Sequence, residues 1–366
     1  MIKISPFKSL LFYFSPFYKG LPLFIILSFL LSCVSLTPVL ARSFPEPKLE
    51  KISDFYAKRL LYPKISGWRQ QSLHGSYKVF EPELPDSVKN NSGIVLILHD
   101  ALSPAPEHYA GFIRYLTATG WIVVFPFYSA PASTKGEHLY SAVWALKDFL
   151  QQYADLKKAP PPVDKFAVWG HGTGALLAAN LSASYDYFGL PHPKALLLMT
   201  PKKSFGKLLD LTGISRETFM VVVVGDKMKR ADIHFAAEMF HGTDRVPRAN
   251  KLFVTVRSDM HGRPPLIADY SAPLSSVTRP SSPLFRTSEA EWILAFNRDF
   301  RSGYVHASPL TLYDFLVTFR IFDNLTSAAL EERQGLKELL YSKEFSSMGY
   351  WTDGKRINPM KVTANP

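Results

Sequence analysis

Six short, almost continuously apolar runs constrain the fold of this chain more than any other feature. They span residues 94–98, 122–125, 166–169, 195–199, 219–224 and 252–256, and amphipathic stretches separate them. A strand that is covered by helices on both faces is apolar throughout, whereas a half-exposed strand alternates between apolar and polar residues. The pattern therefore predicts an α/β fold with a mostly parallel central sheet flanked by helices.

The stretches around this predicted sheet indicate helices and edge strands. Apolar residues at helical spacing predict helices over residues 109–116 and 139–153, and residues 51–84 predict one or two antiparallel edge strands, with 76–80 the best candidate. Beyond about Pro283 the pattern becomes helical over 289–300, 310–325 and 327–340, and a polar tail follows from about Lys355. We therefore expect an α/β domain over residues 48–300 and a helical C-terminal extension over residues 301–366 that packs on it.

Residues 1–41 have the composition of an export signal. Lys3, Lys8 and Lys19 precede an apolar run over residues 21–31, no acidic residue is present, and the segment ends at Ala41. This order predicts a signal peptide that is cleaved after Ala41. Two alternatives remain open: lipidation of Cys33, or an uncleaved membrane anchor over residues 21–41. Each places the folded part outside the cytoplasm, in the periplasm, in the extracellular space or anchored to a membrane.

The cysteine content and the charge exclude several classes of function. Cys33 is the only cysteine, so a chain cleaved after Ala41 forms no disulfide, thiolate nucleophile or cysteine metal site. The 366 residues carry a net charge of +11, but the basic residues are spread among acidic ones. No nucleic-acid partner is expected, because no motif that reads nucleic acid accompanies the charge. Oligomeric state has no signature in the sequence.

A glycine-rich turn follows the third of the six runs. Residues 170–174 read Gly-His-Gly-Thr-Gly, and a helix is predicted to begin near Ala175. A strand, the pattern Gly-x-residue-x-Gly and a helix together form the nucleophile elbow of serine esterases, with Gly172 in the position of the serine. Gly170 and Gly174 are the flanking glycines, where a side chain would strike the helix or the neighbouring strand. Gly172 tolerates the strained backbone of such a turn but carries no hydroxyl.

Over residues 93–270 the chain resembles the α/β-hydrolase superfamily, in particular the branch of chlorophyllases, platelet-activating-factor acetylhydrolases and dienelactone hydrolases. The resemblance rests on GIVLILHD ending at Asp100, WGHGTGALLAA around Gly172, PKALLLMTP ending at Pro201, and VTVRSDMHGRPPL around His261. These motifs occur in the order that the family has, and they cover about half of the chain. The resemblance implies an α/β-hydrolase fold.

The resemblance also implies a catalytic triad in the chain order nucleophile, acid, histidine. Gly172 occupies the nucleophile slot and is inactive there, and His261 fits the base. Where the chlorophyllase-like branch has its acid, residues 200–203 read Thr-Pro-Lys-Lys, without a carboxylate. Asp226, after the next strand, is the candidate acid, although a role as a turn residue fits it equally well.

The oxyanion hole implied by the resemblance consists of the backbone N–H groups of Thr173 and Ala101. Asp100 stands where the family has a glycine. A carboxylate pointing inward would oppose a developing oxyanion, whereas one pointing to solvent would not. The sequence leaves both orientations open.

These features predict a catalytically degenerate carboxylesterase relative that binds a small-molecule or lipid-like ligand with acyl or ester character, without a cofactor or a metal. An active ester hydrolase with an unrecognised nucleophile, such as Thr173, is the alternative. A minor alternative is a dinucleotide-binding protein, because Gly170, Gly172 and Ala175 also match G-x-G-x-x-A. A metal site at His99 and His171 has no supporting ligand spacing.

Overall fold

The computed structural model describes residues 44–62, 65–72, 75–83, 92–128, 137–157, 159–203, 207–263, 265–275, 310–330 and 336–366. The expected signal peptide or anchor over residues 1–41, with Cys33, and the expected helix over 289–300 lie outside these residues. Residues Pro45–Pro366 form one compact unit. In the described ranges, no helix has both the length and the apolar character needed to cross a membrane.

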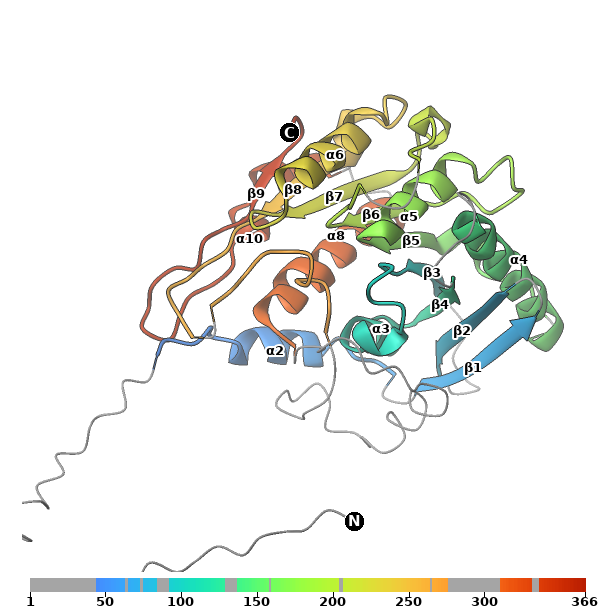
Figure 1. The fold of residues 1–366 in the computed structure, drawn as a ribbon. Helices are drawn as coiled ribbons and strands as arrows, with labels where there is room; N and C mark the ends of the chain where they lie inside the picture. Colours follow the sequence, from blue (N-terminus) through green and yellow to red (C-terminus); the bar gives the residue numbers. More distant parts are fainter. Residues whose placement is uncertain are drawn as a thin grey trace, which may run out of the picture. The chain divides into compact units, whose positions relative to one another are not determined.

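The core of this unit is a nine-stranded sheet with the order β1-β2-β4-β3-β5-β6-β7-β8-β9 (Figure 1). Strands β3 to β8 run parallel to one another, whereas β1, β2 and β9 are antiparallel additions at the two sides. All six predicted strands are confirmed, as is the antiparallel edge pair. The strands are β1 (Ile65–Ser72), β2 (Gly75–Pro82), β3 (Gly93–Leu98), β4 (Trp121–Phe127), β5 (Phe166–His171), β6 (Ala195–Met199), β7 (Phe219–Gly225), β8 (Lys251–Val256) and β9 (Lys361–Thr363).

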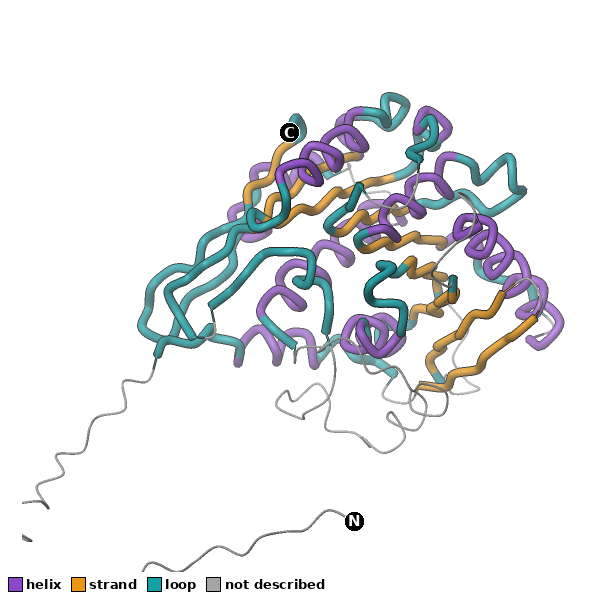
Figure 2. The backbone as a smooth tube through the Cα atoms, viewed as in Figure 1, coloured by secondary structure: helices purple, strands orange, loops and turns teal. Residues whose placement is uncertain are grey.

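Helices cover both faces of the sheet (Figure 2). Their buried side chains form two separate apolar cores, one on each face. One face packs against α2 (Glu50–Ala57), α3 (Ala110–Ala118), the π-helical segment η6 (Asp314–Phe319) and α8 (Arg320–Leu330). The other face packs against α4 (Glu137–Lys157), α5 (Thr173–Ala183) and α6 (Arg230–His241). Burial on both faces explains why the central strands are apolar without alternation.

Short helical elements complete the secondary structure of the residues described above. The 3-10 turns are η1 (Pro106–His108), η2 (Val163–Lys165), η3 (Leu211–Gly213) and η4 (Arg248–Asn250), and two short helices, α9 (Lys337–Tyr341) and α10 (Lys343–Ser346), lie near the C-terminus. The single helix expected over 327–340 was wrong in its bounds. Residues up to Leu330 belong to α8, and the next described helix begins at Lys337.

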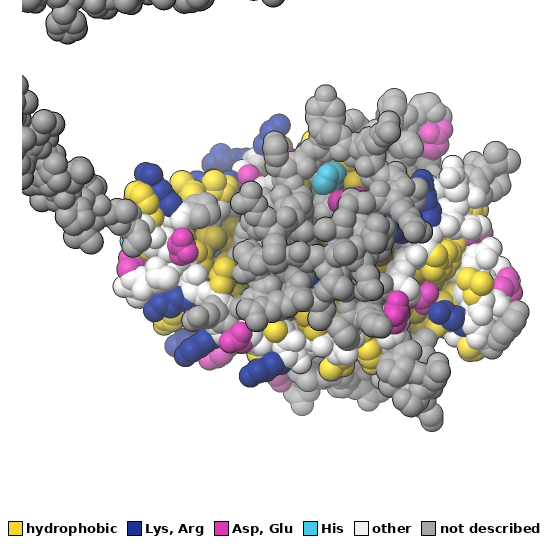
Figure 3. Space-filling view, turned by 90° about the horizontal axis from the view of Figure 1, so that it is seen from below, with side chains coloured by type: hydrophobic (Ala, Val, Ile, Leu, Met, Phe, Trp, Pro, Cys, Tyr) yellow, Lys and Arg dark blue, Asp and Glu magenta, His cyan; other side chains and the backbone are white. Residues whose placement is uncertain are grey.

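The C-terminal residues are part of the folded unit, so the expected polar tail from Lys355 was wrong. Strand β9 pairs antiparallel with β8, and the side chains of Ile357 and Met360 are buried. The pairing covers the edge of β8, which would otherwise expose unpaired backbone groups. On the described part of the face drawn in Figure 3, Lys and Arg side chains lie scattered among acidic and apolar ones.

Candidate functional site

The turn between β5 and α5 places Gly172 at the carboxyl edge of the sheet. Its backbone has φ +58° and ψ −117°, a conformation that side-chain-bearing residues rarely adopt. The N–H group of Gly172 donates to the Met199 carbonyl oxygen at 3.0 Å, and its own carbonyl oxygen accepts from the Lys202 N–H group at 3.2 Å. Backbone hydrogen bonds to the end of β6 therefore hold this turn in place.

The flanking glycines allow α5 to approach the sheet closely. A Cβ atom on Gly170 would lie 2.7 Å from the Ala175 Cα atom. A Cβ atom on Gly174 would lie 2.5 Å from the His99 carbonyl oxygen and would also overlap the Leu98 backbone. Because these neighbours are backbone atoms, they have no side-chain freedom with which to make room. Both positions require glycine, as the Gly-x-Gly-x-Gly pattern predicts.

Asp100 points inward, toward Gly172. A Cβ atom on Gly172 would lie 2.6 Å from the Asp100 Cγ atom and 2.9 Å from its Cβ atom, both closer than atoms can pack. The Asp100 side chain is buried. Of the two orientations that the sequence left open, the structure has the one in which the carboxylate occupies the space above the turn.

Of the two N–H groups expected to form an oxyanion hole, that of Thr173 donates to the Asp100 carboxylate and that of Ala101 donates to the Thr173 hydroxyl. The Asp100 Oδ1 atom accepts from the Thr173 N–H group at 2.9 Å and from the Thr173 hydroxyl at 3.0 Å. The Thr173 hydroxyl oxygen in turn accepts from the Ala101 N–H group at 2.8 Å. The Oδ2 atom accepts from the Leu102 N–H group at 3.2 Å. The N-terminus of α5 thus binds an anion that belongs to the chain itself.

Asp100 is ionised although it is buried. Burial alone would raise its pKa, but the His171 ring, the N–H groups of Thr173 and Leu102, and Lys202 together hold the pKa below its usual range. Burial also lowers the pKa of His171, so that ring is neutral near pH 7. Near neutral pH the backbone donors and Lys202 therefore stabilise the carboxylate.

A buried hydrogen-bond chain connects Asp100 to the far side of the site. The Asp100 N–H group donates to the Tyr109 hydroxyl at 3.0 Å, and that hydroxyl lies 2.9 Å from His171 Nδ1. His171 Nε2 lies 2.7 Å from the Tyr270 carbonyl oxygen and donates to it. Both ring nitrogens of His171 are thus engaged inside the chain, which fits a neutral imidazole in a structural role.

Asp226 and His261 do not form the expected pair. The Asp226 carboxylate accepts from the Ser258 N–H group at 3.0 Å and from the Ser258 hydroxyl at 2.5 Å. His261 lies in the loop after β8, where its Nε2 atom is 2.6 Å from an Asp353 carboxylate oxygen and its Nδ1 atom is 3.2 Å from Lys355 Nζ. In the described residues, no hydrogen bond connects His261 to Asp226 or to the Gly172 turn. The partners of His261 come from the C-terminal segment, and Lys355 is where the sequence pattern had indicated the start of a polar tail.

Four residues at this edge, Asp232, Tyr270, Lys202 and Thr200, were missed as site residues by the sequence analysis. The Asp232 carboxylate accepts from the Lys203 N–H group at 2.9 Å and from the Tyr270 hydroxyl. Lys202 lies over the Tyr270 ring, with Nζ 5.2 Å from the ring centre. Thr200, the residue directly after β6, has φ +44°, a backbone conformation that is unusual for a β-branched residue. Asp232 and Tyr270 carried no signal in the sequence, because they lie outside the motifs and meet only in the folded chain.

The described residues contain no group of three or more His, Cys, Asp or Glu side chains that could hold a metal ion. A cavity at the same edge, between Thr200, Val223 and Thr318, measures only about 10 Å³. That volume corresponds to roughly one water molecule.

Compared with models of known protein families and with curated proteins, the chain matches none.

Proposed function

We propose that this chain is an exported protein of the α/β-hydrolase fold that has lost ester hydrolysis and binds an acyl, ester or lipid-like ligand. The resemblance over residues 93–270 supports the fold, together with the positive φ of Gly172 between a strand and a helix. One observation carries the loss of activity. The Asp100 carboxylate lies where the side chain of a nucleophile would project, and it occupies the Thr173 N–H group.

This arrangement removes two requirements of acyl transfer at once. Gly172 supplies no hydroxyl, and loss of a catalytic serine alone lowers turnover by on the order of a million-fold. The expected oxyanion donor, the Thr173 N–H group, binds a negative charge. A tetrahedral intermediate would have to displace the Asp100 carboxylate and would then be repelled by it.

Thr173 is a poor replacement for the missing nucleophile. Its hydroxyl donates to Asp100 and accepts from the Ala101 N–H group. Asp100 is the group positioned to take its proton, but a carboxylate with a lowered pKa is a weak base. His261 makes its hydrogen bonds with Asp353 and Lys355. In the part of the chain that the structure describes, the alternative of an active hydrolase therefore lacks a strong base for this hydroxyl.

Ester turnover tests this proposal. Purified chain assayed on p-nitrophenyl acetate, butyrate and octanoate should hydrolyse each ester at the rate of buffer alone. Thr173→Val and His261→Ala serve as paired variants, because each removes one remaining group with catalytic chemistry. Turnover by the natural chain that either substitution abolishes would overturn the proposed loss of activity.

Export requires a separate test. The intact mass of the chain recovered from cells should show loss of residues 1–41, or a lipid on Cys33. A full-length mass in the soluble cytoplasmic fraction would contradict export without affecting the argument at Gly172.

A further inference from the structure

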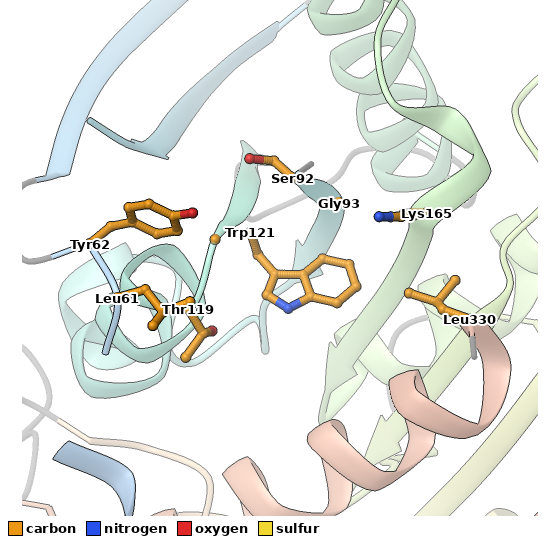
Figure 4. Close-up of a pocket in the computed structure, with 9 residues that line it drawn as sticks. Leu61, Tyr62, Ser92, Gly93, Thr119, Trp121, Lys165 and Leu330 are labelled. Atoms are coloured by element: carbon orange, nitrogen blue, oxygen red, sulfur yellow. The ribbon is translucent and has the colours of Figure 1, made fainter. Parts of the chain in front are cut away.

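A second cavity lies at the opposite, amino edge of the sheet, where β3 begins at Gly93 and β4 at Trp121. It measures about 380 Å³, within the range of roughly 300–1,000 Å³ that is typical of small-molecule sites. Figure 4 shows the Trp121 ring between the side chains of Tyr62 and Lys165. The described residues that line the cavity are Leu61, Tyr62, Ser92, Gly93, Thr119, Gly120, Trp121, Lys165 and Leu330.

The indole of Trp121 is a wall that neighbouring residues hold in place. A Cβ atom on Gly93 would lie 2.6 Å from the Trp121 ring, so the indole packs directly on the backbone of β3. The Phe322 ring of α8 contacts the same indole edge-on, with centroids 5.3 Å apart. The tryptophan is nevertheless only half-buried, and it lines the cavity. A flat apolar group in the cavity can therefore pack on a ring that does not have to move.

The ring of Tyr62 is a second aromatic wall, and backbone hydrogen bonds fix the segment that carries it. The N–H groups of Leu61 and Tyr62 both donate to the Ala118 carbonyl oxygen, at 2.8 and 3.0 Å. Gly120 has φ +102°, and the Tyr62 ring lies 3.3 Å from the place that a Cβ atom would take there. Because both aromatic walls are already ordered, a ligand would not have to order them on binding.

Two hydrogen-bond donors of the described lining have no partner. The Thr119 hydroxyl donates to a backbone carbonyl oxygen of α3 at 2.9 Å, and Ser92 and Lys165 also interact elsewhere in the chain, so these groups are not counted toward a ligand. Among the described residues, no hydrogen bond engages the Tyr62 hydroxyl or the Trp121 indole N–H group. Both groups donate, so a ligand that carries an acceptor oxygen would complete the hydrogen bonding of the site.

We propose that this amino-edge cavity binds a small planar aromatic molecule that carries a carbonyl or similar acceptor oxygen. The ring packs against Trp121 and Tyr62, and the oxygen accepts from the Tyr62 hydroxyl. Recognition comes from ring packing and this hydrogen bond, and it does not depend on the charge around the cavity. The site is separate from the Gly172 turn, so it would stand even if ester turnover were found there.

Two fluorescent probes that differ in one acceptor group test the site. Prodan is a dimethylaminonaphthalene that carries a ketone, and 2-(dimethylamino)naphthalene lacks that ketone. Titration of the folded full chain should give saturable binding of prodan at one site. Tyr62→Phe should weaken prodan about fivefold, which is typical for loss of one uncharged hydrogen bond, and should leave the ketone-free probe unchanged.

Matched variants separate this site from nonspecific probe binding. Tyr341→Phe removes the same hydroxyl from a side chain of α9 that is 80% exposed, and it should change neither affinity. Tyr62→Leu should weaken both probes, because it removes the aromatic wall as well as the hydroxyl. Melting temperatures near that of the natural chain confirm that each variant is folded. A prodan affinity that Tyr62→Phe leaves unchanged would overturn the proposal, as would nonsaturable binding.

Discussion

The two edges of the central sheet use glycine in opposite ways. At the carboxyl edge, the missing side chain of Gly172 leaves space that the Asp100 carboxylate fills. At the amino edge, Gly93 and Gly120 bring aromatic rings onto the backbone, and a cavity of about 380 Å³ remains beside them. Ligands of open α/β sheets usually bind at the carboxyl ends of the strands. In this chain a side chain of its own occupies that position, and the larger described space lies at the other end.

The largest expected effect concerns a second buried carboxyl group near the carboxyl edge, Asp314. Burial raises its pKa to about 7, opposite to the shift at Asp100. The folded chain therefore holds a proton that the unfolded chain releases above pH 4. The contribution of Asp314 to stability should therefore fall by roughly 3–4 kcal/mol between pH 4 and pH 7, whereas Asp100 stabilises the fold above pH 4 and loses that contribution as the pH falls.

Urea unfolding at pH 4, 5, 6 and 7 tests whether the free energy of unfolding falls as the pH rises. Asp314→Asn should remove most of the decline, because its amide oxygen can still accept from the Thr311 N–H group. Asp54→Asn, at an exposed position of α2, is the control and should keep the decline. Identical pH profiles for the natural chain and Asp314→Asn would contradict the assignment.

A somewhat smaller loss of stability tests directly whether the Asp100 carboxylate fills the space at Gly172. Gly172→Ser should destabilise the fold by roughly 3 kcal/mol, from backbone strain at φ +58° and from overlap with Asp100. Gly189 is a matched control, because it has φ +60° and nothing within 4 Å of a Cβ atom. Gly189→Ser should therefore cost only the strain, about 1 kcal/mol.

A double-mutant cycle isolates the contribution of Asp100. In an Asp100→Gly background, Gly172→Ser should cost no more than Gly189→Ser, since the carboxylate is gone. Chemical denaturation of the natural chain, the two single variants and the double variant gives the coupling free energy between positions 100 and 172. Equal costs of Gly172→Ser with and without Asp100 would show that the carboxylate does not occupy this space.

Much of the fold could be predicted from the sequence because the signals are local. A parallel strand buried on both faces must be apolar, so the runs over residues 195–199 and 219–224 identified β6 and β7. The turn at Gly170–Gly174 could also be predicted from the sequence, because close packing of α5 on the sheet excludes any side chain at the flanking positions. Both features depend on residues within one strand–turn–helix unit.

Other features depend on contacts between distant segments. The inward direction of Asp100 results from the pairing of β3 with β5, which brings it over Gly172, and neither residue alone indicates it. Strand β9 has only three residues and forms because β8 offers an unpaired edge. The partner of His261 is Asp353, 92 residues later in the chain. No periodicity connects such residues, so sequence patterns could not identify these contacts.

Reaction with a fluorophosphonate tests the closed carboxyl edge most directly, because this reagent captures any activated hydroxyl nucleophile. After incubation of the purified chain with the reagent, the intact mass should be unchanged, as it should also be for Thr173→Val. A stoichiometric mass increase in the natural chain that is absent in Thr173→Val would contradict the account, because it would show an activated hydroxyl beside Asp100.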